Sequence, residues 1–255
     1  MSELALDDMK VPGESALEAI RAAGYDGIQV GESAKPERIE ACRRLELKVA
    51  GSGRVNLPSE ADWIASRMAD AGFVAGTLHV GWGMEDDDAA RALIEAVLAA
   101  SEKHRLPLYI ETHRATILQD LWRTVQFVRW YPELRFNGDF SHWYTGQELV
   151  YGGFENKSRF IEPVLKRVRF LHGRIGNPGC MQVEIRGDEP FVAHFRELWT
   201  ASMSGFLKSA VAGDQLIFSP ELLAAKIYYE QQPNDRWQQS LLLCRIAREC
   251  FEKAS

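Results

Sequence analysis

The chain has 255 residues, of which 46% are hydrophobic and 26% are charged, as is ordinary for a globular protein with a sizeable core. Its formal net charge of −6 disfavours a nucleic-acid partner, which would need a basic surface. No run approaches the roughly 18 apolar residues of a membrane span, and the N-terminus lacks a signal-peptide pattern. The four cysteines form no CxxC pair, so we expect a cytoplasmic protein with no membrane partner.

Apolar periodicity predicts strands and helices that alternate along the chain. The first half is expected to contain a strand at Leu4–Leu6, a helix at Glu14–Ala23, a strand at Gly24–Gly31, a helix at Pro36–Leu45, a strand at Leu47–Val55, a helix that Ser59 caps and that runs to Ala71, a strand at Val74–Val80 and a helix at Glu85–His104. The second half is expected to contain strands at Pro107–Thr112, Leu134–Phe140, Arg169–Arg174 and Gln215–Ser219, and helices at Thr116–Trp130, Ser158–Val168, Pro190–Ser204 and Asp235–Lys253. Leu4–Leu6 is short and flanked by acids, so the first strand is weak or abbreviated.

Eight alternating units of this kind predict a single α/β domain over residues 1–255, a TIM (β/α)8 barrel with parallel strands. The competing architecture is an open doubly wound sheet. It lacks support because no strand is followed by GxGxxG or GxxxxGK[ST]. Two long loops, Tyr144–Lys157 and Ile175–Glu189, are expected at the C-terminal face, either as a substrate lid or as surface decoration.

Ionisable side chains follow four consecutive strands at their C-terminal ends. They are Glu111, Asp139, His172 and Glu221. Because the site of a parallel barrel is built at that face, we expect these side chains to meet. Three carboxylates and one imidazole suit a hard divalent ion, Mn²⁺, Mg²⁺ or Co²⁺ ahead of a cysteine-rich zinc site, although the sequence does not separate these ions from Zn²⁺.

Glu111 and Glu221 are the predicted catalytic pair. A carboxylate can bind a metal through one oxygen while the other oxygen faces the substrate, so each glutamate can serve as a ligand and as a proton-transfer base. A divalent ion beside a carbonyl and a hydroxyl acidifies the carbon between them. Such acidification is what aldose–ketose isomerisation and epimerisation require.

Further candidates lie at the same strand ends. Taken singly, a carboxylate after a strand is more often a helix cap or an ion-pair partner, and a histidine is more often a satisfied core residue. Their joint occurrence on consecutive strands favours a site. The candidates for substrate binding are His79, His113, His142, Trp143 and Arg174. Trp82 and Tyr144 are weaker candidates for stacking on a sugar, with packing as the alternative, and Arg114 for binding an anion, with a rim salt bridge as the alternative.

The motifs GYDGIQV, ETHR, NGDFSHW, FLHGR and FSPELL, in this order between Gly24 and Leu223, resemble the xylose isomerase-like TIM barrels, which include sugar phosphate isomerases and epimerases and endonuclease IV. This resemblance implies the same four metal ligands, with the two glutamates as the proton-transfer pair and with His142 and Arg174 as contacts to substrate oxygens. The chain departs from the sugar epimerases at the second strand, where Gln29 and then Glu32 stand in place of a glutamate. It also lacks the extra strand-end ligands of the three-zinc endonuclease.

The sequence therefore predicts a metal-dependent isomerase or epimerase that acts on a small sugar through an enediolate. Two alternatives remain open. One is a metal-dependent lyase such as a sugar-acid dehydratase, in which Arg114 or Arg174 binds the carboxylate. The other is a non-catalytic barrel that has lost the metal. A homo-oligomer is compatible with the sequence, with Trp237 and the closing helix as a candidate face.

Overall fold

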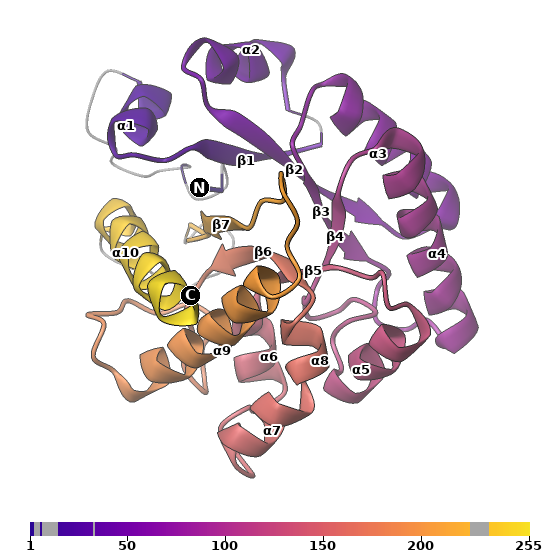
Figure 1. Ribbon diagram of the computed structural model, residues 1–255, viewed down its shortest axis with the longest axis vertical. Coiled ribbons are helices and arrows are strands. Elements are labelled where there is room, and N and C mark those ends of the chain that lie inside the picture. Colours follow the sequence, from indigo (N-terminus) through magenta and orange to yellow (C-terminus); the bar gives the residue numbers. More distant parts are fainter. Residues whose placement is uncertain (3–5, 7–14, 33, 225–234) are drawn as a thin grey trace.

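The computed structural model describes residues 1–2, 6, 15–32, 34–224 and 235–255. Seven parallel strands of this described part form one sheet in which every strand pairs with the next one along the chain. The strands are β1 (Gly27–Gly31), β2 (Lys48–Val55), β3 (Gly76–Val80), β4 (Leu108–Glu111), β5 (Phe136–Gly138), β6 (Val168–Gly173) and β7 (Ile217–Pro220). The sheet curves into a nearly closed barrel with the helices outside it (Figure 1). The predicted TIM-like α/β architecture is confirmed.

Ten helices lie in the described part of the chain. They are α1 (Ala16–Ala22), α2 (Pro36–Arg44), α3 (Pro58–Asp70), α4 (Asp87–His104), α5 (Leu121–Trp130), α6 (Phe140–Gly146), α7 (Phe154–Phe160), α8 (Glu162–Leu165), α9 (Pro190–Leu207) and α10 (Arg236–Ala254). None of these described helices has the length and apolar character that a membrane crossing requires.

Met1 and Ser2 supply the contact between the two edge strands. Ser2 forms a parallel bridge with Gln29 of β1, and its N–H donates to the carbonyl of Pro220, at the end of β7, at 3.0 Å. The first strand is therefore abbreviated, as expected, but it lies earlier than predicted. Of the predicted strand Leu4–Leu6, residues 4 and 5 lie outside the described residues and Leu6 lies in a turn.

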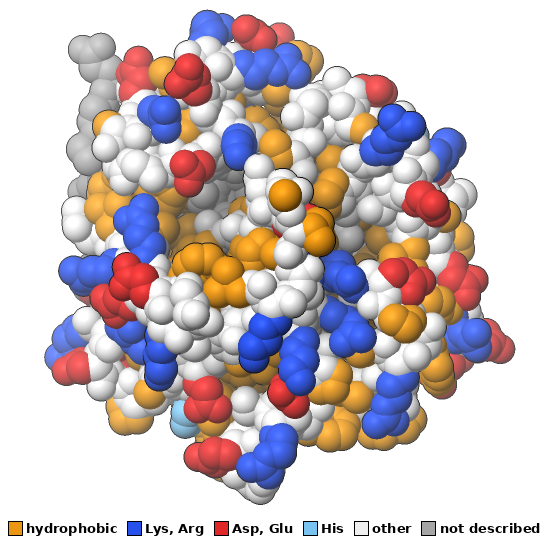
Figure 2. Space-filling model, viewed as in Figure 1, with side chains coloured by type: hydrophobic (Ala, Val, Ile, Leu, Met, Phe, Trp, Pro, Cys, Tyr) orange, Lys and Arg blue, Asp and Glu red, His pale blue; other side chains and the backbone are white. Residues whose placement is uncertain are grey.

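A hollow remains where an eighth full strand would run. It has a volume of about 700 Å³ and lies at the amino ends of β1 and β7, against α10, with Tyr25, Phe218 and Phe251 in its wall. Figure 2 shows it as a depression in the face of the molecule that is in view.

Small residues on the sheet allow the helices to pack closely. Gly51 of β2 and Gly76 of β3 are register partners, and Met68 of α3 lies over both. A Cβ atom at either glycine would lie 2.7 Å from the Met68 sulfur, which is too close for a van der Waals contact. Glycine at both positions therefore lets Met68 fill the space between helix and sheet.

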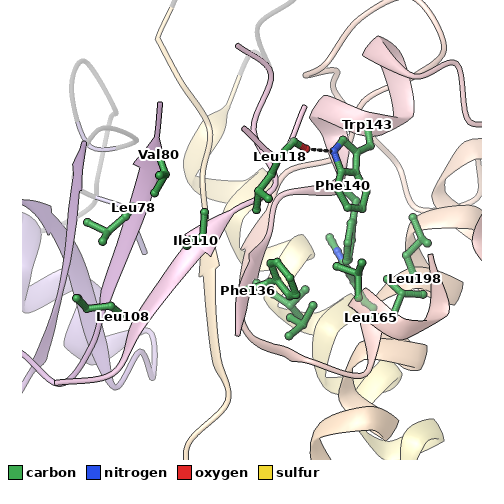
Figure 3. Packing of buried hydrophobic residues seen from close by; sticks show 14 of the residues in the cluster. Leu78, Val80, Leu108, Ile110, Leu118, Phe136, Phe140, Trp143, Leu165 and Leu198 are labelled. Carbon is green, nitrogen blue, oxygen red and sulfur yellow. Dashed lines mark hydrogen bonds between the residues drawn. The ribbon is translucent and has the colours of Figure 1, made fainter. Parts of the chain in front are cut away.

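The core is continuous behind the later strands. Phe136 of β5 and the buried residues Phe140 and Trp143 of α6 pack with Leu165 and Leu198 (Figure 3). Each such side chain contributes about 1.5–3 kcal/mol on burial. This cluster fixes the start of α6 beneath the carboxyl ends of β5 and β6.

The predicted strand Leu134–Phe140 is too long at its end. β5 stops at Gly138 because Asp139 is the N-cap of α6, where its Oδ1 accepts the N–H of Ser141 at 3.1 Å. Helix α6 thus begins inside the predicted strand and extends into the predicted loop Tyr144–Lys157. The predicted helix Ser158–Val168 is divided into α7 and α8.

Capping also moves three helix starts. Ser59 does not cap α3, because the helix begins at Pro58 and the Glu60 carboxylate instead accepts the N–H of Leu57 at 3.0 Å. Helix α5 begins at Leu121 rather than at Thr116, since the Asp120 side chain is its cap. The third is α4, which begins two residues later than predicted. Its N-cap is Asp86, whose carboxylate accepts the N–H of Ala89.

Candidate metal centre

The four residues predicted as metal ligands meet at the carboxyl ends of neighbouring strands. Glu111 ends β4, Asp139 follows β5, His172 lies in β6 and Glu221 follows β7. Each offers one atom within 4.8 Å of the others, and all four residues are buried. His172 Nδ1 is the common partner, at 3.4 Å from Glu111 Oε2 and 3.2 Å from Glu221 Oε2.

Gln29 fixes the orientation of His172. The Gln29 amide nitrogen donates to Thr77 Oγ1 at 2.8 Å, so its oxygen is left to accept the Nε2–H of His172 at 2.9 Å. The imidazole therefore presents Nδ1 to the three carboxylates. A metal-binding histidine is held in this way, with its other nitrogen donating to an oxygen.

Arg174 ties the cluster to the start of α6. Its Nη2 donates to Asp139 and, at 2.7 Å, to His142 Nε2, and its Nε donates to Ser141 Oγ at 3.0 Å. The guanidinium is 1% exposed, so a substrate would reach it only from within the site.

The ionisation of the cluster is uneven. Burial opposes the charged form of Glu111, but His172 and His79 outweigh it and hold the pKa of Glu111 well below its usual range. Burial likewise opposes ionised Asp139, yet Arg174 and His142 lower the pKa of that carboxyl. By contrast, burial raises the pKa of Glu221 even though His172 and Arg174 act against it. The two glutamates are thus pushed apart in proton affinity, as in sites that pair an acid with a base.

His172 balances these carboxylates as a cation. Burial alone would lower its pKa, but the charges of Glu221 and Glu111 outweigh burial and raise the pKa of His172 well above its usual value. The imidazolium and the Arg174 guanidinium together face three carboxylates. A divalent cation fits this donor set, because it would take the place of the His172 proton among hard oxygen ligands and one nitrogen.

Three histidines form a row beside the cluster. The rings of His79 and His113 have centroids 4.0 Å apart, and those of His113 and His142 are 3.8 Å apart. His113 Nδ1–H donates to the Arg114 carbonyl at 2.5 Å, which leaves Nε2 as an acceptor. Burial and then His79 lower the pKa of His113 to about 4, so its ring is neutral near pH 7.

His142 carries an unsatisfied buried donor. Its Nε2 accepts from Arg174, and burial holds its pKa well below the usual value, so the proton of the neutral ring lies on Nδ1. That atom has no hydrogen-bond partner among the described residues. A buried donor without a partner costs about 1–3 kcal/mol, and a substrate oxygen would satisfy it.

His79, Glu111 and His113 also offer atoms within 4.8 Å of one another. However, Arg54 Nη2 donates to His79 Nδ1 at 3.3 Å. Because Nδ1 is an acceptor, a ring proton lies on Nε2, which is 3.3 Å from Glu111 Oε1. His79 in this state is a hydrogen-bond donor that orients Glu111 rather than a metal ligand.

The aromatic candidates lie away from the cluster. Trp143 is 1% exposed, and its indole N–H donates to the Leu118 carbonyl at 2.8 Å (Figure 3). Tyr144 is also buried, and its hydroxyl contacts His194 Nδ1. Trp82 is 51% exposed and lies under the Arg54 guanidinium, 4.3 Å from the ring centroid.

Sequence reasoning missed several residues that hold the site. Asn137 of β5 donates to Glu111 Oε2 at 3.0 Å, and its Oδ1 is buried without a partner in the described chain. Asn137 and Gln29 are neutral amides within strands, so no charge pattern marks them. Their signal is that each is a polar residue in a buried strand. Arg54, the second-last residue of β2, is half-buried and follows Gly53, so its signal is only that of a charged residue within a strand.

No protein-family model matches the chain, and no curated protein matches its sequence. Solved structures do match its fold. An L-ribulose 3-epimerase is 14% identical over 100% of this chain and 94% of that chain, with a TM-score of 0.59. The probable 3-DHS dehydratase AsbF from Bacillus anthracis is 10% identical over 96% and 97%, with a TM-score of 0.62. A sugar phosphate isomerase/epimerase from Parabacteroides distasonis is 11% identical over 92% and 89%, with a TM-score of 0.60.

At these identities the comparisons establish a shared fold, and function depends on the site itself. The fold is the one expected from the resemblance of the motifs to xylose isomerase-like barrels.

Proposed function

We propose that this chain is a divalent-metal-dependent isomerase or epimerase of a small sugar, working by proton abstraction next to a carbonyl. The observation that carries the proposal is the buried meeting of Glu111 and Glu221 around one histidine, with their pKa values displaced in opposite directions. Solved structures of the same fold include an L-ribulose 3-epimerase.

Glu111, Asp139, His172 and Glu221 would hold the ion. When bound, Mn²⁺, Mg²⁺, Co²⁺ or Zn²⁺ would polarise the substrate carbonyl and acidify the neighbouring C–H. The protein supplies the rest. Arg174 keeps Asp139 ionised, and Gln29 keeps His172 Nδ1 turned towards the carboxylates.

Proton transfer falls to the two glutamates. One of Glu111 and Glu221 takes the proton from the carbon, giving an enediolate, and the other glutamate or solvent returns a proton. His142 Nδ1–H donates to a substrate oxygen, and His113 Nε2 accepts from a hydroxyl. His79 holds Glu111 in place. Trp143 has no role in this scheme because its side chain is buried in the hydrophobic core.

A sugar-acid dehydratase is the second candidate, and Arg54 favours it. Arg54 lies beside His79 and has no carboxylate partner at ion-pairing distance among the described residues; its two hydrogen bonds go to the Gly81 carbonyl and to His79. A guanidinium in that state can bind a substrate carboxylate. The same carbanion would then expel a β-hydroxyl instead of being reprotonated.

The first experiment measures C–H exchange, which needs no knowledge of the product. The metal-loaded protein is incubated in D₂O with a panel of ketoses, ketose phosphates and sugar acids, and deuterium at carbon is followed by NMR. Exchange without loss of water supports the isomerase or epimerase, whereas loss of water supports the dehydratase. Glu221→Gln is expected to slow exchange by about 10²-fold or more, the usual contribution of a general base.

Glu32→Gln is the matched control, because Glu32 follows β1 at the same end of the barrel but is outside the cluster. It is expected to exchange at the wild-type rate. Elemental analysis is made on the same preparations, together with Asp139→Asn. About one equivalent of divalent ion in the wild type and in Glu32→Gln, but not in Asp139→Asn, is the expected result. Equal metal content in the wild type, Glu32→Gln and Asp139→Asn would contradict the proposal that Asp139 belongs to a metal centre.

A further inference from the structure

A second concave region lies at the opposite end of the barrel from the metal cluster. It has a volume of about 510 Å³ and is walled by the loop before β5, by α8 and by the C-terminal part of α9. We call it the basal basic hollow. Its charged lining residues are Arg135, Glu162, Lys166, Arg167, Arg169 and Lys208. Figure 2 shows Lys and Arg side chains gathered on this face of a chain whose net charge is −6.

The positive charge of the basal basic hollow is largely unpaired by carboxylates. Lys166 Nζ pairs with Glu162 at 2.7 Å. Among the described residues, no carboxylate oxygen lies within 4.0 Å of the cationic nitrogens of Arg135, Arg167 or Arg169. The same holds for Lys208, which is exposed. Three guanidinium groups and one ammonium group therefore face the hollow without a counter-ion in direct contact.

Carbonyl groups at helix ends offset only part of the positive charge of the basal basic hollow. Arg167 Nη1 donates to the Pro163 carbonyl at 2.9 Å, and Arg135 Nη1 donates to the Pro132 carbonyl at 2.8 Å, so the arginines satisfy one carbonyl within α8 and one just beyond α5. A helix C-terminus is equivalent to about −0.5 of a charge. The carboxylates that act on the hollow are Glu162, which pairs with Lys166, and Glu133 and Asp214, which act on Arg135 and Arg169 without an ion pair in direct contact, so the five cations still outnumber the carboxylates.

The arginines are crowded as well as unpaired. Burial lowers the pKa of Arg135, and the charges of Arg169 and Arg167 lower it further. Arg169 is 8% exposed and is fixed by a hydrogen bond from its Nη2 to Ser209 Oγ at 2.7 Å. An anion between these groups would offset their mutual repulsion.

The walls of the hollow are set by backbone packing. Gly205 of α9 lies against Lys166, and a Cβ atom at position 205 would be 2.5 Å from the Lys166 Cα. The glycine thus lets α9 approach the end of α8 directly, which brings Lys208 and Ser209 beside Arg169. Because these walls are helix and strand ends, the hollow is largely formed before a ligand arrives.

We propose that the basal basic hollow binds a small phosphorylated molecule, with its phosphate group between Arg135, Arg167 and Arg169. A phosphate monoester carries close to two negative charges at neutral pH and would be attracted by the excess of cations in the hollow. Guanidinium groups bind phosphate through paired N–H donors. The volume leaves room for an organic portion beside the phosphate. The acidic remainder of the surface disfavours a long polyanion such as nucleic acid.

The test is calorimetric titration of chelator-treated protein with three probes: AMP, adenosine and inorganic phosphate. AMP is expected to bind and adenosine is not. Tighter binding of AMP than of inorganic phosphate would assign an organic phosphate, whereas equal binding would assign the free phosphate ion as the ligand. Failure of both phosphate probes to bind at 10 mM, a concentration about tenfold above a weak Kd of 1 mM, would overturn the proposal.

Variants locate the binding. Arg135→Gln is expected to weaken AMP binding at least tenfold and Lys208→Gln about threefold. Lys208 is exposed as the C-cap residue of α9, so its replacement is expected to preserve the fold and keeps the test decisive if Arg135→Gln unfolds. Arg129→Gln on the exposed face of α5 is the charge-matched control and is expected to bind like the wild type. Glu221→Gln separates this site from the metal cluster. Binding that is lost in Glu221→Gln but kept in Lys208→Gln and Arg135→Gln would refute the assignment.

Discussion

Gln29 of β1 is a point at which the chain departs from the sugar epimerases that its motifs resemble, which often carry a glutamate there. The structure gives the amide a definite task, since its oxygen accepts the His172 proton while its nitrogen donates to Thr77. A glutamate at this position would also accept from His172, but it would add a fourth carboxylate to a buried group of three. That added charge would raise the pKa of Glu221 further. A neutral amide orients the histidine without this cost.

Replacing Gln29 by Met is expected to weaken metal binding by about 10- to 100-fold, the usual effect of losing the outer partner of a ligating histidine. Met keeps the volume but leaves the His172 Nε2–H and the Thr77 hydroxyl without their partner. The measurement is a competition titration of metal against a chromophoric chelator.

Gln147→Met serves as the control for Gln29→Met, because Gln147 is the half-buried C-cap of α6 and its side chain bonds only to the Gly146 carbonyl among the described residues. It should bind metal like the wild type. If Gln29→Met binds metal with unchanged affinity, the orientation of His172 does not depend on the amide.

At the scale of the element, helix starts are decided by caps, and a cap depends on one side chain. The sequence shows that α4 begins within an acidic run, but only geometry shows which acid is the cap. Glu85 turns back, and its carboxylate accepts the N–H groups of Trp82 and Gly83 at 2.7 and 2.8 Å. Asp86 is then left to accept the N–H of Ala89 at 2.8 Å.

Asp86→Ala is expected to lower the free energy of unfolding by about 1 kcal/mol, the typical value for an N-cap, and therefore the melting temperature by about 2–4 °C for a chain of this size. Asp88→Ala is the matched control. Asp88 lies in the first turn of the same helix and interacts with its dipole, an effect worth about 0.3–1 kcal/mol. Chemical unfolding of both variants measures the difference. Equal losses would mean that charge alone, and not the cap, stabilises this end.

For the whole molecule, the alternation of strands and helices was sufficient to predict the barrel, because parallel strands joined by helices have few ways to close. It also predicted which strand ends carry the cluster. The neutral side chains that hold the cluster in place could not be predicted from the sequence. Asn137 contacts Glu111, which lies 26 residues away along the chain. Gln29 contacts His172, which lies 143 residues away. Both contacts join different strands, so no local pattern in the sequence predicts them. The start of α6 after Asp139 was equally hidden, since an aspartate after a strand can be a helix cap or a metal ligand and the sequence does not separate the two roles.

The proposed metal ligands come from the ends of four strands, so a bound ion is expected to stabilise the whole barrel. At a free concentration 100 times its Kd, Mn²⁺ should add about 2.7 kcal/mol to the free energy of unfolding, which corresponds to a melting temperature roughly 5–10 °C higher than in chelator. The shift should depend on pH. The pKa of His172 is raised by Glu221 and Glu111 once the opposing effect of burial is overcome, so below that pKa the ion must displace a proton.

Metal affinity should therefore rise about tenfold per pH unit while His172 remains protonated, and at a fixed Mn²⁺ concentration the stabilisation should be larger at pH 8 than at pH 6. Without metal the sign is opposite. A histidine with a raised folded-state pKa stabilises the fold at low pH, and this contribution is lost as the pH rises through that pKa. Differential scanning calorimetry at both pH values, with and without Mn²⁺, measures both effects. Asp139→Asn should lose the metal-induced shift. A shift of the same size at pH 6 and pH 8 would mean that His172 is not a ligand.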